Sequence, residues 1–128
     1  MASGMSIDGM EALLARLNGL GDRAARVQNQ ALRAAGNLVA EAMRENVPVS
    51  NVEHLHIRDD IQVSRVKVSA DGVRSVDVGP GPKTGWRAKF LEFGTSKMQA
   101  QPFVERSLIE KRRDALDVIA ETVRAALK

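Results

Sequence analysis

The sequence predicts an α+β domain in which two long helices pack on a small antiparallel sheet of three or four strands. Apolar residues recur with a helical period before residue 46 and again after residue 102, which predicts a helix in each region. Between residues 58 and 79 they alternate with polar residues instead, as strands require. Because the chain has 128 residues, we expect residues 1–128 to form a single domain with a modest core.

The N-terminal part predicts a short helix followed by a long one. Residues 6–20 read as the short helix, capped by Ser6 or Asp8 and loosened by the glycines that follow. From Asp22 to about Asn46 the apolar stripe is rich in alanine, which permits close approach of a neighbouring element. Pro48 disfavours the helical conformation of the preceding residue and should end this helix. The stripe consists of Val27, Ala31, Ala35, Leu38 and Ala42, widened by Val39 and Met43.

The central segment predicts a β-hairpin. Its valines and isoleucines alternate in two phases, so we expect a bulge or twist near Ser64 and Arg65, where the phase changes. Asp71-Gly72 is a tight-turn signal and should join the two arms. The alternating residues are Ile61, Val63, Val66, Val68, Val76 and Val78.

After the hairpin, residues 79–85 read GPGPKTG, which predicts an exposed loop. A third strand over residues 87–93 is expected to pair with the hairpin and to end at Gly94, since glycine tolerates a positive φ. Thr95 and Ser96 should finish the turn. Pro102 suits the first turn of a last helix, which should run to near Leu127. Its predicted stripe is Ile109, Leu116, Ala120, Val123 and Leu127.

The composition excludes several classes of protein. The chain contains no cysteine, which removes disulfides, thiolate zinc sites and cysteine nucleophiles. No apolar run approaches the roughly 20 residues that span a bilayer, and the start MASGMSIDGM lacks the order of a secretory signal. We therefore expect a soluble protein, made in the cytoplasm, with no membrane contact.

Candidate metal and catalytic groups are sparse. His54 and His56 would point to the same side of a strand and, with Asp59 and Asp60, form a weak candidate for a metal site. Ser50 or Ser64 beside these histidines lacks any geometry that would make it a nucleophile. The GPGPKTG segment lacks the spacing of a phosphate-binding loop. We expect neither catalysis nor a cofactor.

The basic charge is concentrated in one stretch. Residues 81–100 contain four basic residues and one acidic residue, Glu92, an excess as large as the net charge of +3 for the whole chain. Such a surface could be a solvated loop, or it could meet DNA phosphates or an acidic partner. An aromatic content of 3% argues against the stacking platforms of single-strand binding proteins.

Two residues of this stretch have open interpretations. Trp86 could anchor a protein interface, where tryptophan is over-represented, or it could cover the domain core. On the predicted strand, Glu92 would point away from Leu91 and Phe93. It would then face solvent or pair with an Arg or Lys of a neighbouring subunit.

The sequence FLEFGTSKMQAQPF, residues 90–103, carries a family resemblance. A strand ending in EFGT, then SKM, a small spacer and PF before a long C-terminal helix, resembles the tail-component family of lambdoid long-tailed bacteriophages. The resemblance extends to the Ala-rich helix that ends near Pro48 and Val49. Residues 50–61, SNVEHLHIRDDI, depart from the family pattern, and only residues 55–61 look similar to it.

This resemblance implies a structural protein of the virion neck. Such a protein forms a homo-oligomeric ring, a hexamer, at the head-proximal end of the tail and completes or terminates the tail for head-tail joining. Its partners would be other neck, connector and tail-tube proteins, with DNA in the lumen. The alternative is a small basic nucleic-acid-binding or regulatory protein that uses residues 83–97. The interface candidates are Lys83, Trp86, Arg87, Glu92, Phe93, Gly94, Thr95, Lys97 and Pro102.

Overall fold

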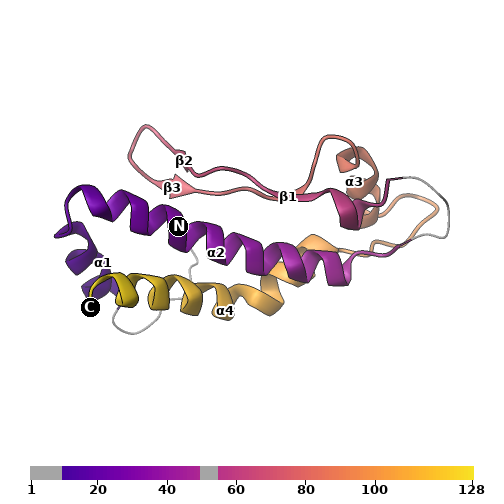
Figure 1. Cartoon of the computed structure of the whole chain (residues 1–128). Helices are drawn as coiled ribbons and strands as arrows, with labels where there is room; N and C mark the ends of the chain where they lie inside the picture. Colours follow the sequence, from indigo (N-terminus) through magenta and orange to yellow (C-terminus); the bar gives the residue numbers. More distant parts are fainter. Residues whose placement is uncertain (1–9, 50–54) are drawn as a thin grey trace.

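The computed structural model describes residues 10–49 and 55–128. Within them, the long helix α2 lies between a hairpin of short strands and the second long helix, α4 (Figure 1). The predicted α+β class, with two long helices and a small antiparallel sheet, is confirmed. In chain order the elements are α1 (Met10–Asn18), α2 (Asp22–Asn46), the 3-10 helix η1 (Ile57–Asp60), β1 (Ile61–Val63), β2 (Lys67–Val68), β3 (Arg74–Ser75), β4 (Val78–Pro80), α3 (Gly85–Phe93) and α4 (Phe103–Ala126).

Helix α2 has the predicted limits. Gly21, with a φ of 62°, makes the sharp turn from α1, and Val47 leaves the helix with an extended backbone (φ −76°, ψ 134°) because Pro48 follows. The alanine-rich stripe is buried, with the exception of half-buried Leu38. Helix α1 lies inside the predicted range of residues 6–20, and its predicted caps, Ser6 and Asp8, lie outside the described residues.

The hairpin forms as two short ladders offset by one residue. In the first, Ile61 pairs with Pro80, and in the second, Lys67 pairs with Ser75. Three residues separate β1 from β2 but only two separate β3 from β4, which is the mismatch that a bulge produces. The bulge therefore lies at residues 64–66, as predicted. Asp71-Gly72 forms the turn, with Gly72 at a φ of 86°.

One glycine of α2 brings the hairpin close to the helix. A Cβ atom added to Gly36 would lie 3.0 Å from Val63 Cγ1 and 3.4 Å from Val76 Cγ2. The two valines come from opposite arms of the hairpin. The hairpin therefore rests on α2 so closely that a side chain at position 36 would force the neighbouring valine side chains to shift.

Residues 87–93 do not form the predicted third strand. They belong to helix α3, whose inward positions Ala88 and Leu91 follow the buried cap residue Thr84 at i+4 and i+7. Periodicity alone cannot separate a short buried strand from a short helix, and here the bulky residues of the segment face outward instead. The loop prediction for residues 79–85 is also wrong in part, because Gly79 and Pro80 belong to β4 and Thr84 is fully buried.

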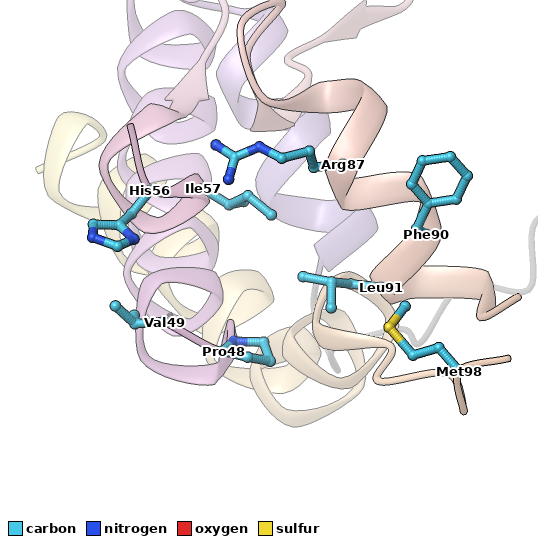
Figure 2. A pocket seen from close by; sticks show the side chains of 8 residues that line it. All are labelled: Pro48, Val49, His56, Ile57, Arg87, Phe90, Leu91 and Met98. Atoms are coloured by element: carbon cyan, nitrogen blue, oxygen red, sulfur yellow. The ribbon is translucent and has the colours of Figure 1, made fainter. Parts of the chain in front are cut away.

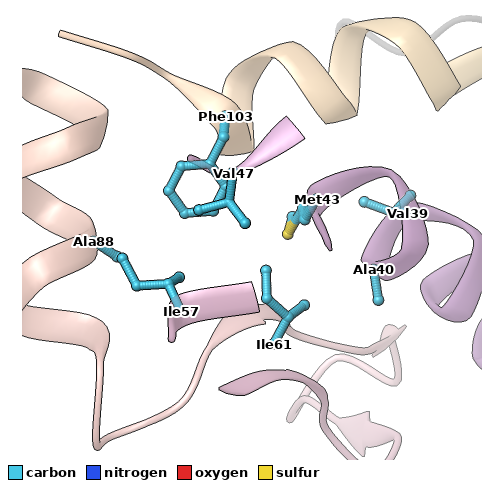
Figure 3. Packing of buried hydrophobic residues seen from close by; sticks show 8 residues of the cluster. All are labelled: Val39, Ala40, Met43, Val47, Ile57, Ile61, Ala88 and Phe103. Carbon is cyan, nitrogen blue, oxygen red and sulfur yellow. The ribbon is translucent and has the colours of Figure 1, made fainter. Parts of the chain in front are cut away.

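The core consists of two clusters along α2 and α4. The first joins α2, η1, β1, α3 and the start of α4 around Phe103 (Figure 3). The second joins α1 and α2 to the C-terminal part of α4. Helix α4 follows Pro102 as predicted. Ile109, the first residue of its predicted apolar stripe, is 70% exposed, because the second cluster contacts this stripe only from Leu116 onward. None of the described helices is long and apolar enough to cross a membrane.

Candidate interface on helix α3

A buried carboxylate fixes the start of α3. Asp60, at the end of η1, is 6% exposed, and its Oδ2 atom accepts hydrogen bonds from the Thr84 backbone N–H (3.1 Å) and hydroxyl (2.8 Å). Its Oδ1 atom accepts a third bond from Gln62 Nε2 at 3.1 Å. These three donors offset the cost of burying the charge. The segment before α3 is therefore anchored to the base of the hairpin.

A second carboxylate fixes the end of α3. The Oε1 and Oε2 atoms of Glu92 accept the backbone N–H groups of Val104 (3.0 Å) and Glu105 (2.9 Å). These N–H groups belong to the first turn of α4, where they have no partner within the helix and where negative charge is favourable. The strand-based expectation for the direction of Glu92 was wrong, because this side chain joins α3 to α4 within the protomer.

The chain between the two helices folds into a compact turn. Gly94 has a φ of 74°, and a Cβ atom there would lie 2.8 Å from the Ala100 nitrogen, so only glycine fits without strain. The Thr95 N–H donates to the Met98 carbonyl (2.9 Å), and the Gln101 N–H donates to the Leu91 carbonyl (2.6 Å). The turn therefore folds back onto α3.

The outward face of α3 is aromatic. Trp86, Phe90 and Phe93 are 62%, 49% and 79% exposed, respectively. They are three of the four aromatic residues in the chain, and only Phe103 contributes a ring to the core. The rings of Trp86 and Phe90 meet edge to face, with centroids 6.3 Å apart and planes at 83°. At this exposure Trp86 does not cover the core, so that alternative is excluded. We call these three side chains the aromatic face.

Basic residues stand before, within and after the aromatic face in the sequence. Lys83, Lys89 and Lys97 are exposed and form no ion pair with any described residue. Arg87 is half-buried; its guanidinium carbon lies 6.0 Å from the centroid of the Trp86 ring and the group donates to the Leu55 carbonyl. The single acidic residue of the stretch, Glu92, is already bound to α4. The basic excess expected from the sequence is therefore present on this surface.

A largely apolar pocket of about 340 Å³ lies beside the aromatic face (Figure 2). Phe90 belongs to both, so the pocket and the aromatic face form one continuous surface. In Figure 2 Leu91 and Met98 lie on the α3 side and Val49 and Pro48 on the side of the segment after α2. The lining residues are Pro48, Val49, His56, Ile57, Arg87, Phe90, Leu91 and Met98.

The other candidate sites are not assembled in the described part of the chain. His54 and Ser50 lie outside the described residues, and His56 precedes the 3-10 helix η1 instead of lying on a strand. Ser64 donates to the Arg65 carbonyl and accepts the Asp77 N–H, so its hydroxyl belongs to the hairpin. Among residues 10–49 and 55–128, no group of three His, Cys, Asp or Glu side chains could hold a metal ion.

Sequence reasoning placed Lys83, Trp86, Phe93 and Lys97 on this surface, and all four are exposed. Phe90 is absent from the predicted interface candidates, because residues 87–93 are expected to form a strand, and Lys89 is counted there only among the basic residues of the stretch. The spacing of Trp86, Phe90 and Phe93 at i, i+4 and i+7 is the signal that could have found them. Gly94 and Thr95 shape the turn, and Pro102 precedes α4.

A small α+β fold with an exposed aromatic face and nearby basic residues has the features of a protein that contacts other proteins. A family model described as "Bacteriophage HK97-gp10, putative tail-component" matches residues 11–94. The chain therefore belongs to this family of phage tail components. No curated protein and no solved structure matches the chain.

The range matched by the family model covers most of the elements described above. It contains α2, the hairpin and α3 with its aromatic face, and it ends at Gly94, so the turn and α4 lie beyond it. A member of this family has a structural role in the phage tail, is part of the virion and contacts other tail proteins.

Proposed function

We propose that this protein is a neck component that forms a homo-oligomeric ring, a hexamer, at the head-proximal end of the phage tail. The ring completes or terminates the tail so that it can join a DNA-filled head. The observation that carries the proposed contact with neighbouring neck proteins is the aromatic face of α3, whose three side chains are 49–79% exposed in a protein of a tail-component family. Large exposed apolar side chains gathered on one surface are typical of sites that bind other proteins.

The protein would act by forming interfaces with other proteins, and it would catalyse no reaction. Asp60 fixes the start of α3 and Glu92 fixes its end, so the aromatic face is already ordered before a partner arrives. A pre-ordered surface loses little conformational entropy on binding, and more of the contact energy remains for assembly. Lys83, Arg87 and Lys97 would add electrostatic attraction, while Gly94, Thr95 and Pro102 would hold the turn in shape.

A small basic protein that binds nucleic acid is the second candidate. The exposed Lys83, Lys89 and Lys97 favour it, since each could neutralise a phosphate. The geometry of the rings does not, because Trp86 and Phe90 meet edge to face and form no flat platform for bases. Strong, salt-sensitive binding of duplex DNA by the isolated protein would favour this candidate over a ring component.

Deletion of the gene from an otherwise complete phage tests the proposal. We expect DNA-filled heads and tails to accumulate separately, or tails of abnormal length if the protein is a terminator, as judged by electron microscopy of the lysate. Purified protein added to heads and completion-defective tails should restore infectious particles without any small molecule. Normal, infectious particles in the deletion strain would contradict the neck assignment.

A further inference from the structure

We infer that the aromatic face and the adjoining pocket form a docking site for an acidic segment of a different virion protein. A large apolar side chain of that segment would enter the pocket, and its carboxylates would face the surrounding lysines. This inference rests on the proposed function and specifies the chemistry of the partner.

The apolar part of the argument begins with the aromatic face. Trp86 and Phe93 are 62% and 79% exposed, although burial of an aromatic side chain is among the largest single gains available to a fold. The core is complete without them, since both clusters close around other residues. Their exposure is therefore explained by a partner that buries them, and tryptophan is the residue most enriched among energetically dominant interface contacts.

The pocket indicates how such a partner would be anchored. Its volume of about 340 Å³ lies within the range of sites that enclose a ligand group. Ile57, Phe90 and Leu91 give it an apolar lining, and Arg87, which also contacts Trp86, adds a cation to that lining. A protruding Leu, Met or Phe side chain, flanked by an acidic residue, matches that lining.

The charges on this surface indicate a negatively charged partner. Lys83, Lys89 and Lys97 have no ion-pair partner among the described residues, and Glu92 is bound to the first turn of α4. The surface therefore offers cations and no available carboxylate of its own stretch. Two copies placed with these surfaces face to face would bring like charges together, which disfavours a symmetric pair and favours an acidic partner.

A second copy of this chain does not offer the required surface. Outside α3, the described large apolar side chains that are more than half exposed are Val68, Val73 and Ile109. The two valines lie at the hairpin beside charges of both signs, and Ile109 is followed after one acid by three basic residues, at positions 111–113. Since neither surface has an acidic excess, the partner is a different protein.

The single tryptophan provides a direct assay, because it lies on the proposed site. The probe is a synthetic helical peptide built from Glu, Leu and one Phe. We expect it to shift the Trp86 emission to shorter wavelength, with a saturable response that weakens in high salt. Control peptides replace Glu by Lys, or Leu and Phe by Ser, and neither should produce the shift.

Variants of the protein separate charge from apolar contact. Lys83→Glu/Lys89→Glu and, separately, Phe93→Ser should each weaken peptide binding by about tenfold or more. Val73→Ser and Lys128→Glu serve as matched controls, because both residues are exposed. Val73 directly precedes β3 and Lys128 is the last residue, and Figure 1 shows β3 and the C-terminus at the opposite end of the molecule from α3. Unchanged circular dichroism and melting show that each variant is folded.

The outcomes distinguish this inference from the proposed function. The inference is overturned if the Lys peptide binds as well as the Glu peptide, or if only duplex DNA or anionic phosphatidylserine vesicles shift the emission. It is also overturned if Lys83→Glu/Lys89→Glu fully complements a defective deletion phage, a result that leaves the neck role intact. Compensating changes from acidic residue to Lys in another virion protein would support it. Normal particles in the deletion strain would instead remove the neck role, while the peptide assay would still judge the docking site.

Discussion

Replacement of Glu92 by Ala removes the two hydrogen bonds that cap α4 from outside the helix. The lost contacts are the bonds from the Val104 and Glu105 N–H groups, at 3.0 and 2.9 Å. Loss of a side-chain cap costs about 0.5–2 kcal/mol, and loss of a charge near a helix N-terminus costs about 0.3–1 kcal/mol. Because the Glu105 bond is exposed to solvent, we expect a total loss of about 1–2 kcal/mol from the free energy of unfolding.

Urea unfolding followed by circular dichroism measures this loss. The midpoint should fall while the dependence on denaturant stays unchanged, since the same surface is exposed on unfolding. Glu92→Gln retains one acceptor oxygen without the charge and should lose about half as much. Glu121→Ala, a change of an exposed carboxylate toward the C-terminal end of α4 and far from its first turn, is the matched control and should have little effect.

Two results would refute the reasoning about Glu92. Stability of the Ala variant equal to that of the control would mean that the cap contributes nothing to the folded state. A Gln variant as unstable as the Ala variant would mean that the charge alone, and not the geometry of the two bonds, is responsible.

Three further predictions concern the core, the surface and the turn. Phe103→Ala and Val123→Ala change residues that are 1% exposed, and they should lower the free energy of unfolding by about 3–5 and about 1–3 kcal/mol, respectively. Each variant should still unfold in one cooperative transition. Two separate unfolding transitions would contradict our proposal of a single domain. Lys83→Ala and Lys97→Ala should leave the melting temperature nearly unchanged and impair assembly of particles; a large loss of stability would show that these residues are structural. Gly94→Ala should cost at least about 1–2 kcal/mol by urea unfolding, because it forces a positive φ and a contact with the Ala100 nitrogen; wild-type stability would mean that the turn can relax.

Much of the fold could be predicted because its signals are local. Helix α2 repeats its apolar period from Val27 to Met43 and is stopped by Pro48, so its limits follow from the sequence. The hairpin was likewise indicated by Asp71-Gly72 and by the change of phase at Ser64. Each of these features depends on residues that are close together in the chain.

Helix α3 could not be predicted in the same way, because contacts distant in sequence decide its conformation. Thr84 is bound by Asp60, 24 positions earlier, and Glu92 binds Val104, 12 positions later. A nine-residue helix is marginal by itself, so these two anchors and the burial of Ala88 determine the outcome. The basic residues and the single tryptophan indicate the candidate site in the sequence. The shape of the aromatic face could not be predicted, because it requires Trp86, Phe90 and Phe93 to lie on one face of a helix.

The two anchors of α3 have a mechanical consequence for a protein of the phage tail. Tension applied at Phe90, near the middle of the helix, is divided between the Asp60 contact at one end and the Glu92 contact at the other. The first transmits its share into the hairpin and the second into α4, which packs along α2. Neither carboxylate bears the whole load, and detachment of α3 also requires exposure of Ala88 and loss of the bond from the Gln101 N–H to the Leu91 carbonyl.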